Sequence, residues 1–140
     1  MASFVTYRGA VQPDELDRLG HMNIQHYMAR LSLAGFAVME TIGLGEASAT
    51  HGRKALSMLR CEIEFRRELT TGEATRIETE IETVGTKSLT FRHRLIVDAD
   101  DGLAMEAKVV AVCIDLDTRR SSPLPDDVAA AARALISTAP

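Results

Sequence analysis

The chain has 140 residues and a mass of 15.3 kDa, which fits one compact domain over residues 1–140. Its net charge of -4 argues against a nucleic-acid partner, because phosphate binding relies on surplus Lys and Arg. No apolar run approaches the roughly 20 residues that cross a bilayer, and residues 1–7 lack the apolar stretch of a signal peptide. We therefore expect a cytoplasmic protein with no membrane partner.

The first half of the chain predicts one strand and one long helix. Residues 3–11 favour a short strand, which Pro13 ends because proline removes a ladder donor. From Ile24 onward, apolar residues recur at steps of three and four, and the opposite side of this segment is also apolar at Leu33 and Phe36. Such a helix is normally buried on most sides. Asn23 fits the N-cap, and Gly43 with Gly45 supplies the stop.

After Lys54 the apolar period changes to two, which indicates strands. Leu59, Cys61, Ile63 and Phe65 alternate with charged residues, and three further strands are expected over 76–83, 87–97 and 103–117. Gly72, Gly85 and the turn at 100–102 separate them at hairpin intervals. A short helix over 128–136 follows the prolines at 123 and 125.

This order of elements predicts an α+β fold. Long antiparallel strands with one apolar face must cover that face, and the single long helix is the only sizeable cover. A curved antiparallel sheet wrapped around one helix is the hotdog architecture. Sheet edges need covering, which makes a homodimer or homotetramer plausible.

The turn before the helix is the best candidate for chemistry. Asp17 precedes the helix start, Gly20 permits a tight turn, and the first helical amides near Asn23 and Ile24 lack intrahelical acceptors. A carboxylate beside free amides at the positive end of a helix dipole could attack a carbonyl and hold the resulting oxyanion. An Asp in such a turn is, from spacing alone, more often a simple cap or turn former.

The segment Asp17-x-x-Gly20-His21-Met22-Asn23-x-x-x-Tyr27 resembles the 4-hydroxybenzoyl-CoA thioesterase-like, YbgC/FadM-type hotdog acyl-CoA thioesterases. Its Gly-His-Met-Asn string is most similar to the betainyl-CoA thioesterase-like branch. The resemblance extends over nearly the whole chain. It implies hydrolysis of an acyl-coenzyme A, with coenzyme A as part of the substrate and no separate cofactor.

The resemblance also implies roles for individual residues. Asp17 would be the nucleophile or the general base, and the Ile24 amide would form the oxyanion site. Asn23 would cap the helix or bind the attacking water, and His21 would tune Asp17 or fill the turn. Gly20 and Tyr27 would line the substrate site.

A second set of residues is implied for the coenzyme A moiety. Thr86, Lys87 and Ser88 are similar to segments that line the pantetheine arm and phosphates, often across a dimer interface. Nearby arginines are further candidates for the phosphates: Arg60, Arg66, Arg92 and Arg94. For any one of them, solvated charge on a strand is the more common explanation.

Other polar residues carry weaker expectations. His93 falls in an apolar alternating set, where a satisfied core histidine is the default. His21, His26 and Asp17 have no recognised ligand spacing, and Cys61 and Cys113 show no metal or disulfide pattern, so no metal site is expected.

Several alternatives remain open at this point. A hotdog enoyl-thioester hydratase or dehydratase, or a non-catalytic acyl-thioester binding module, would use the same fold. The acyl group is also open. The betainyl-type pattern has Trp-Ile-Asp where this chain has Glu15-Leu16-Asp17, so an aromatic wall for a quaternary ammonium is missing there.

Overall fold

A computed structural model describes residues 2–45 and 51–137 of the chain. These residues form, in chain order, β1 (Phe4–Ala10), the 3-10 turn η1 (Pro13–Glu15), α1 (Ile24–Ile42), β2 (Lys54–Phe65), β3 (Ala74–Val84), β4 (Ser88–Val97), β5 (Gly102–Asp115), β6 (Arg120–Ser121) and α2 (Asp126–Ser137). No helix among them is long and apolar enough to span a membrane.

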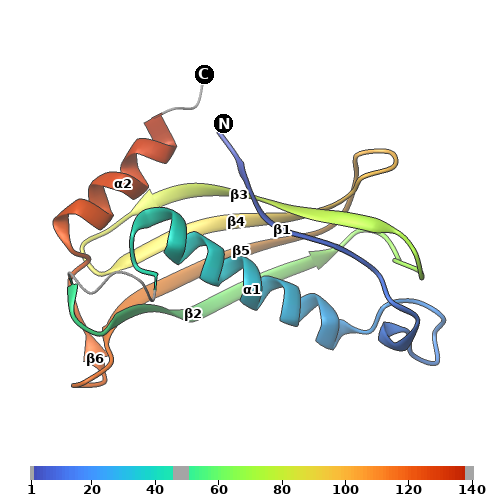
Figure 1. Cartoon of the computed structure of the whole chain (residues 1–140), viewed down its shortest axis with the longest axis horizontal. Coiled ribbons are helices and arrows are strands. Elements are labelled where there is room, and N and C mark those ends of the chain that lie inside the picture. The colour runs from blue at the N-terminus through green and yellow to red at the C-terminus, as the bar shows by residue number, and fades with distance from the viewer. Residues whose placement is uncertain (1, 46–50, 138–140) are drawn as a thin grey trace.

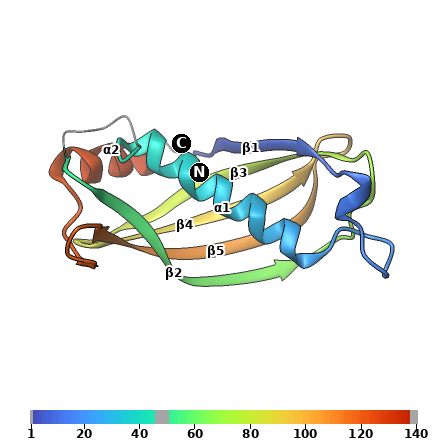
Figure 2. The same cartoon turned by 60° about the horizontal axis from the view of Figure 1, so that its bottom comes forward.

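The strands form one antiparallel sheet in the order β1-β3-β4-β5-β2, with β6 paired to β5. Figures 1 and 2 show α1 lying across one face of this curved sheet, with α2 packed near its far end. The inward side chains of β4 and β5 are buried beneath α1. The predicted α+β hotdog fold is confirmed.

Both predicted ends of the long helix are confirmed. The Asn23 side chain accepts a hydrogen bond from the Gln25 amide at 3.0 Å and caps the N-terminus of α1. Gly43 ends the helix at φ +93°, a left-handed conformation that glycine adopts without steric cost.

The prediction that α1 is buried on most sides is wrong for the single chain. Leu31, Ala34 and Val38 are fully buried against the sheet, but Leu33 and Phe36 on the other side are 55% and 59% exposed. Apolar residues occur on both sides of the helix, but within one chain the sheet covers only one of them.

The expected hairpin around Gly72 is also wrong. β2 pairs with β5 at one edge of the sheet, while β3 lies on the far side of β4, so residues 66–73 form a crossover. This crossover bonds to the N-terminal turn, because the Met22 amide donates to the Leu69 carbonyl and the Gly72 amide to the Val11 carbonyl. It thereby lies against the segment that precedes α1.

The predicted alternation of β2 is broken by a bulge. The register shifts between Met58 and Arg60, so Leu59 lies outside the pairing and is 71% exposed rather than inward-facing. The predicted last strand ends earlier, at Asp115, and a turn then leads to β6, which was not predicted.

Candidate active site

The turn before α1 is a closed loop. Leu16 and Met22 form an isolated antiparallel bridge, the Asp17 amide donates to the His21 carbonyl at 3.2 Å, and the Gly20 amide donates to the Asp17 carbonyl at 3.0 Å. Gly20 has φ +82°, so the turn uses a conformation that side chains rarely adopt. This loop presents the side chain of Asp17 beside the helix start.

The Asp17 carboxylate is held at both oxygens. Its Oδ2 accepts from the Asn23 Nδ2 at 2.7 Å, and its Oδ1 accepts from the Leu19 amide at 2.8 Å. The bond from Asn23 is the main cause that lowers the pKa of Asp17 below its ordinary value of 3.8, followed by the Leu19 amide. Asp17 is therefore an oriented, ionised carboxylate at neutral pH.

The first amide of α1 is free. The Gln25 amide donates a hydrogen bond to the Asn23 side chain at 3.0 Å, and the His26 amide donates one to the Asn23 carbonyl at 3.0 Å. The Ile24 amide has no acceptor within the described part of the chain. It stands at the positive end of the helix dipole, one residue after the side chain that holds Asp17.

A buried ion pair fixes the turn to the helix. Arg30, only 4% exposed, donates to both carboxylate oxygens of Glu15 at 2.7 and 2.8 Å. These bonds lower the pKa of Glu15 to about 2. The backbone carbonyl of Glu15 also accepts a hydrogen bond from the Asn23 amide, at 2.9 Å. Glu15 thus serves as a structural carboxylate that joins the turn to α1.

A pocket of about 490 Å³ opens in front of these groups. It is lined by Asp17, Leu19, His21, Met22, Asn23, Ile24, Tyr27, Phe65, Arg66, Arg67 and Glu68. The rings of Tyr27 and Phe65 meet edge to face, with centroids 5.0 Å apart at 81°. The predicted residues Asp17, His21, Asn23, Ile24 and Tyr27 therefore share one site, and Gly20 shapes its turn.

Some lining residues were missed from the sequence because they come from β2 and the crossover. Phe65 ends β2, and Arg67 and Glu68 belong to the segment that was expected to be a hairpin. Among these residues the sequence indicates only Arg66, as a candidate phosphate ligand; its guanidinium pairs with Glu64 at 2.7 Å. The available sequence signal was their position: Phe65 is the last apolar residue of the predicted strand, and residues 66–68 follow directly after it.

Among the described residues, the His21 ring has contacts other than a hydrogen bond to Asp17. Its Nδ1 lies 3.3 Å from the Met22 carbonyl, and its Nε2 lies 3.9 Å from a carboxylate oxygen of Glu68. Its charge contributes only the smallest of the effects on the pKa of Asp17. It lines the pocket mainly as a wall.

Thr86, Lys87 and Ser88 lie elsewhere. Ser88 begins β4 at the end of the sheet that packs near the C-terminus of α1, whereas Asp17 lies at the N-terminus. The Lys87 ammonium is 3.5 Å from the Ser121 hydroxyl, and the Thr86 carbonyl accepts from the Leu124 amide. A single chain does not bring this trio to Asp17.

The remaining arginine candidates also have other partners. Arg92 pairs with Glu82 and Glu106, Arg94 pairs with Glu80, and Arg60 pairs with its neighbour Glu62. Among residues 2–45 and 51–137, no cluster of three metal-ligating side chains occurs.

A family model and a curated relative both match this chain, and both are thioesterases by description. The model of the Thioesterase-like superfamily matches residues 11–132. A betainyl-CoA thioesterase of Pseudomonas aeruginosa is 27% identical over 130 residues, covering 93% of this chain and 82% of the relative.

Solved structures show the same fold. A proposed thioesterase of Pseudomonas putida superposes with a TM-score of 0.83 at 25% identity, covering 99% of this chain and 88% of the other. A Staphylococcus aureus protein solved in complex with CoA superposes with a TM-score of 0.87 at 20% identity, covering 100% and 89%.

Proposed function

The chain belongs to the thioesterase-like superfamily, and on that premise we propose that it hydrolyses an acyl-coenzyme A thioester with Asp17 as its catalytic carboxylate. The observation that carries this proposal is the pairing of an ionised, doubly held Asp17 with the free Ile24 amide in one pocket. The coenzyme A part is supported by the betainyl-CoA thioesterase relative and by the CoA-bound neighbour.

In the first step of the proposed reaction, the carbonyl oxygen of the thioester accepts a hydrogen bond from the Ile24 amide. Attack at the carbonyl carbon moves charge onto that oxygen, which the amide and the helix dipole stabilise. Collapse expels the coenzyme A thiolate, a good leaving group that needs no strong general acid. Water supplies the hydroxyl of the acid product and the proton of the thiol.

We propose that Asp17 attacks the carbonyl directly. Its lowered pKa makes it a weak proton acceptor near neutral pH, where an efficient general base has a pKa close to the working pH. Direct attack forms a mixed anhydride with the acyl group, which water then cleaves. Label in the Asp17 carboxylate after single-turnover hydrolysis in heavy-oxygen water would show that water attacked the Asp17 carbonyl of the anhydride, which activation of water cannot produce. No acyl group on Asp17 in rapid-quench mass spectrometry during the turnover would favour activation of water instead.

We further propose a homodimer whose site lies between subunits. β2 has a strand partner on one side only among the described residues, and its unpaired edge carries exposed Met58, Leu59 and Phe65. A two-fold axis pairing two β2 strands antiparallel would place the Phe65 end of one beside the Lys54 end of the other. Lys87 of the partner subunit would then approach Asp17.

The first test is thiol release from a panel of acyl-coenzyme A esters: short, medium and long aliphatic, benzoyl, phenylacetyl and betainyl. We expect turnover of some members, reduced by about three orders of magnitude in Asp17→Asn, because the variant keeps the shape but loses the carboxylate. Asp14→Asn, an equal charge change at an exposed position of η1, is the control and should keep turnover.

Unchanged turnover in Asp17→Asn would contradict the mechanism. No turnover by the wild type, despite binding of the esters, would instead favour a hydratase or a binding module.

A further inference from the structure

A second pocket lies further along α1 than the Asp17 pocket, and each of the two is lined by residues of both α1 and β2. Ile24 and Tyr27 of α1 line the Asp17 pocket with Phe65 of β2. The second pocket is lined by Leu56–Met58 of β2 and by one face of α1, made of Met28, Leu31, Ser32, Gly35, Phe36 and Met39. α1 and β2 therefore frame both pockets while running in opposite directions. Figure 2 shows α1 running obliquely over the sheet, with its N-terminal part near the end of the edge strand β2. In the inference drawn below, an acyl chain anchored at Ile24 runs along α1 into the second pocket.

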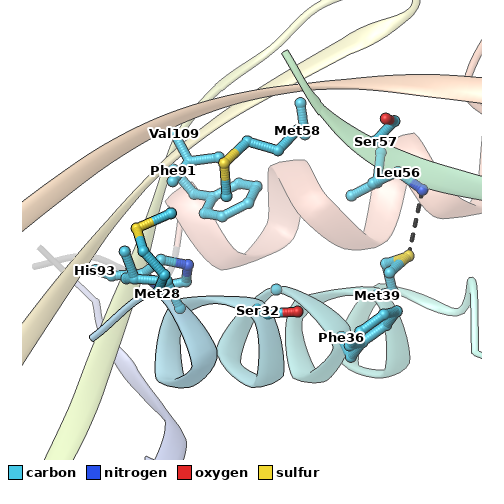
Figure 3. A pocket seen from close by; sticks show the side chains of 13 residues that line it. Met28, Ser32, Phe36, Met39, Leu56, Ser57, Met58, Phe91, His93 and Val109 are labelled. Atoms are coloured by element: carbon cyan, nitrogen blue, oxygen red, sulfur yellow. Dashed lines mark hydrogen bonds between the residues drawn. The ribbon is translucent and has the colours of Figure 1, made fainter. Parts of the chain in front are cut away.

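This second pocket has a volume of about 310 Å³ and is mostly apolar. Its walls include Met28, Leu31, Phe36, Met39, Met58, Phe91 and Val109, a composition that suits an aliphatic chain. Figure 3 shows Phe36 and Met39 at one end, and His93 beside Met28 at the other. The polar groups on its walls are Ser32, Ser57 and His93.

His93 is the unusual member of this wall. Its side chain is fully buried, and its Nε2 has no hydrogen-bond partner among the described residues. An unpaired buried polar nitrogen is unfavourable, so a position that retains one calls for an explanation. The expectation of a satisfied core histidine is thus confirmed for Nδ1, which lies 2.7 Å from the Thr79 hydroxyl, and is wrong for Nε2.

A chain of hydroxyl groups fixes the tautomer of His93. The Thr6 hydroxyl donates to the Ile77 carbonyl at 3.4 Å and lies 2.8 Å from the Thr79 hydroxyl. With its own proton used, Thr6 must accept from Thr79, and Thr79 must in turn accept from His93. Only this direction makes all three hydrogen bonds at once. Nδ1 therefore carries the proton, and Nε2 presents a lone pair.

The ring remains neutral at physiological pH. Burial lowers the pKa of His93 to about 4. Nε2 is thus a hydrogen-bond acceptor in apolar surroundings, with the edge-to-face ring of Phe91 beside it at 5.0 Å between centroids. Such an acceptor recognises a hydroxyl or N–H group and gains nothing from a methylene group.

We infer that the second pocket selects acyl groups carrying a hydroxyl group several carbons from the thioester, which donates to Nε2 of His93. The inference rests on the proposed acyl-coenzyme A hydrolysis and deepens it. The distance supports a remote hydroxyl, because Met28 and Ser32 stand about 6 and 12 Å beyond Ile24 along α1 at 1.5 Å per residue. A hydroxyl next to the thioester carbonyl would remain in the Asp17 pocket.

The experiment compares hexanoyl-, octanoyl- and decanoyl-coenzyme A with their ω-hydroxy counterparts. For at least one chain length, we expect kcat/KM for the hydroxylated ester to exceed that for the plain ester by about 10- to 100-fold. His93→Phe should bring this ratio to about one, whatever its absolute rate. Ser32→Ala, which removes a hydroxyl from the same pocket, should keep the ratio. A ratio near one in the wild type at every length, or a ratio lost only in Ser32→Ala, would overturn the inference.

A binding measurement decides the inference without relying on turnover or on folding of His93→Phe. Nitrogen NMR of Asp17→Asn follows the Nε2 signal of His93 as each ester is added. We expect the hydroxylated ester to shift this signal toward that of a hydrogen-bonded imidazole nitrogen, and the plain ester to leave it in place. A shift without thiol release by the wild type would uphold the pocket assignment and overturn the proposed hydrolysis. Thiol release without a shift would do the reverse.

Discussion

Asn23 performs two tasks with the two ends of one amide. Its Oδ1 caps α1 through the Gln25 amide, and its Nδ2 holds Asp17. The sequence-based alternatives for this residue were capping and water binding; capping is confirmed, and the bond to Asp17 was not predicted. Spacing could not reveal it, because the bond depends on how the Gly20 turn folds Asp17 back.

Asn23→Ala should weaken both folding and activity. Loss of the cap should lower the free energy of unfolding by about 1 kcal/mol. Loss of the bond to Asp17 should lower kcat/KM by about 100-fold, since the carboxylate is no longer held in place. Denaturant unfolding and thiol release measure the two effects; a drop in stability with unaltered kinetics would show that the second bond has no role in turnover.

Asn23→Asp separates the two tasks. Aspartate caps helices about as well as asparagine, so stability near neutral pH should change little. The new carboxylate beside Asp17 raises the pKa of Asp17, whereas in the wild type that pKa lies below 3.8. Activity requires the ionised form, so its acid limb should move to higher pH in the variant. Circular dichroism at each pH confirms that the protein is folded, and an unmoved limb would exclude Asp17 as the titrating group.

At the level of elements, the Glu15–Arg30 pair joins η1 to α1. Glu15→Gln should lower the free energy of unfolding by about 3 kcal/mol at pH 7, because it leaves a buried guanidinium without its counter-charge. Glu62→Gln, at an exposed pair, should cost less than about 1 kcal/mol.

The pH dependence of stability provides a second readout of this pair. The folded-state pKa of Glu15 is lowered from 4.5 to about 2, so its stabilisation is complete above pH 4.5 and is lost as pH falls toward 2. The wild type should lose stability in this window more steeply than Glu15→Gln. Parallel curves for the two proteins, from denaturant unfolding at each pH, would contradict the assignment.

The elements also show what sequence patterns can and cannot predict. Asn23 and Gly43 marked the ends of α1 because capping is a local effect. Gly72 did not distinguish a hairpin from a crossover, since a glycine turn can precede β3 in either case and the two differ in which strand is the partner. The bulge at Leu59 was equally invisible, because the alternation on either side of it looks regular.

At the level of the whole molecule, the site residues predicted from the sequence lie near opposite ends of α1 within one subunit. Asp17 lies by the N-terminus of α1, and Lys87 lies by its C-terminal end. Which of these distant residues meet depends on the proposed dimer, which no single-chain pattern determines. Light scattering should give twice the chain mass of 15.3 kDa.

Subunit mixing tests whether the site is shared. Asp17→Asn and Lys87→Ala homodimers should each be weakly active when substrate is below KM. After co-refolding in equal amounts, half of the dimers should be mixed and should hold one site with both native residues, which restores about a quarter of wild-type activity. If Lys87 served the Asp17 of its own chain, no activity would return.

The double use of Asn23 has a consequence for how such proteins diverge. A lineage released from selection for hydrolysis loses its reason to keep the Asp17 carboxylate, but the helix still needs its cap. Substitutions should therefore accumulate at Asp17 earlier than at Asn23. Among descendants of a common ancestor, an intact capping residue beside an altered acid would identify members that have given up chemistry while keeping the fold.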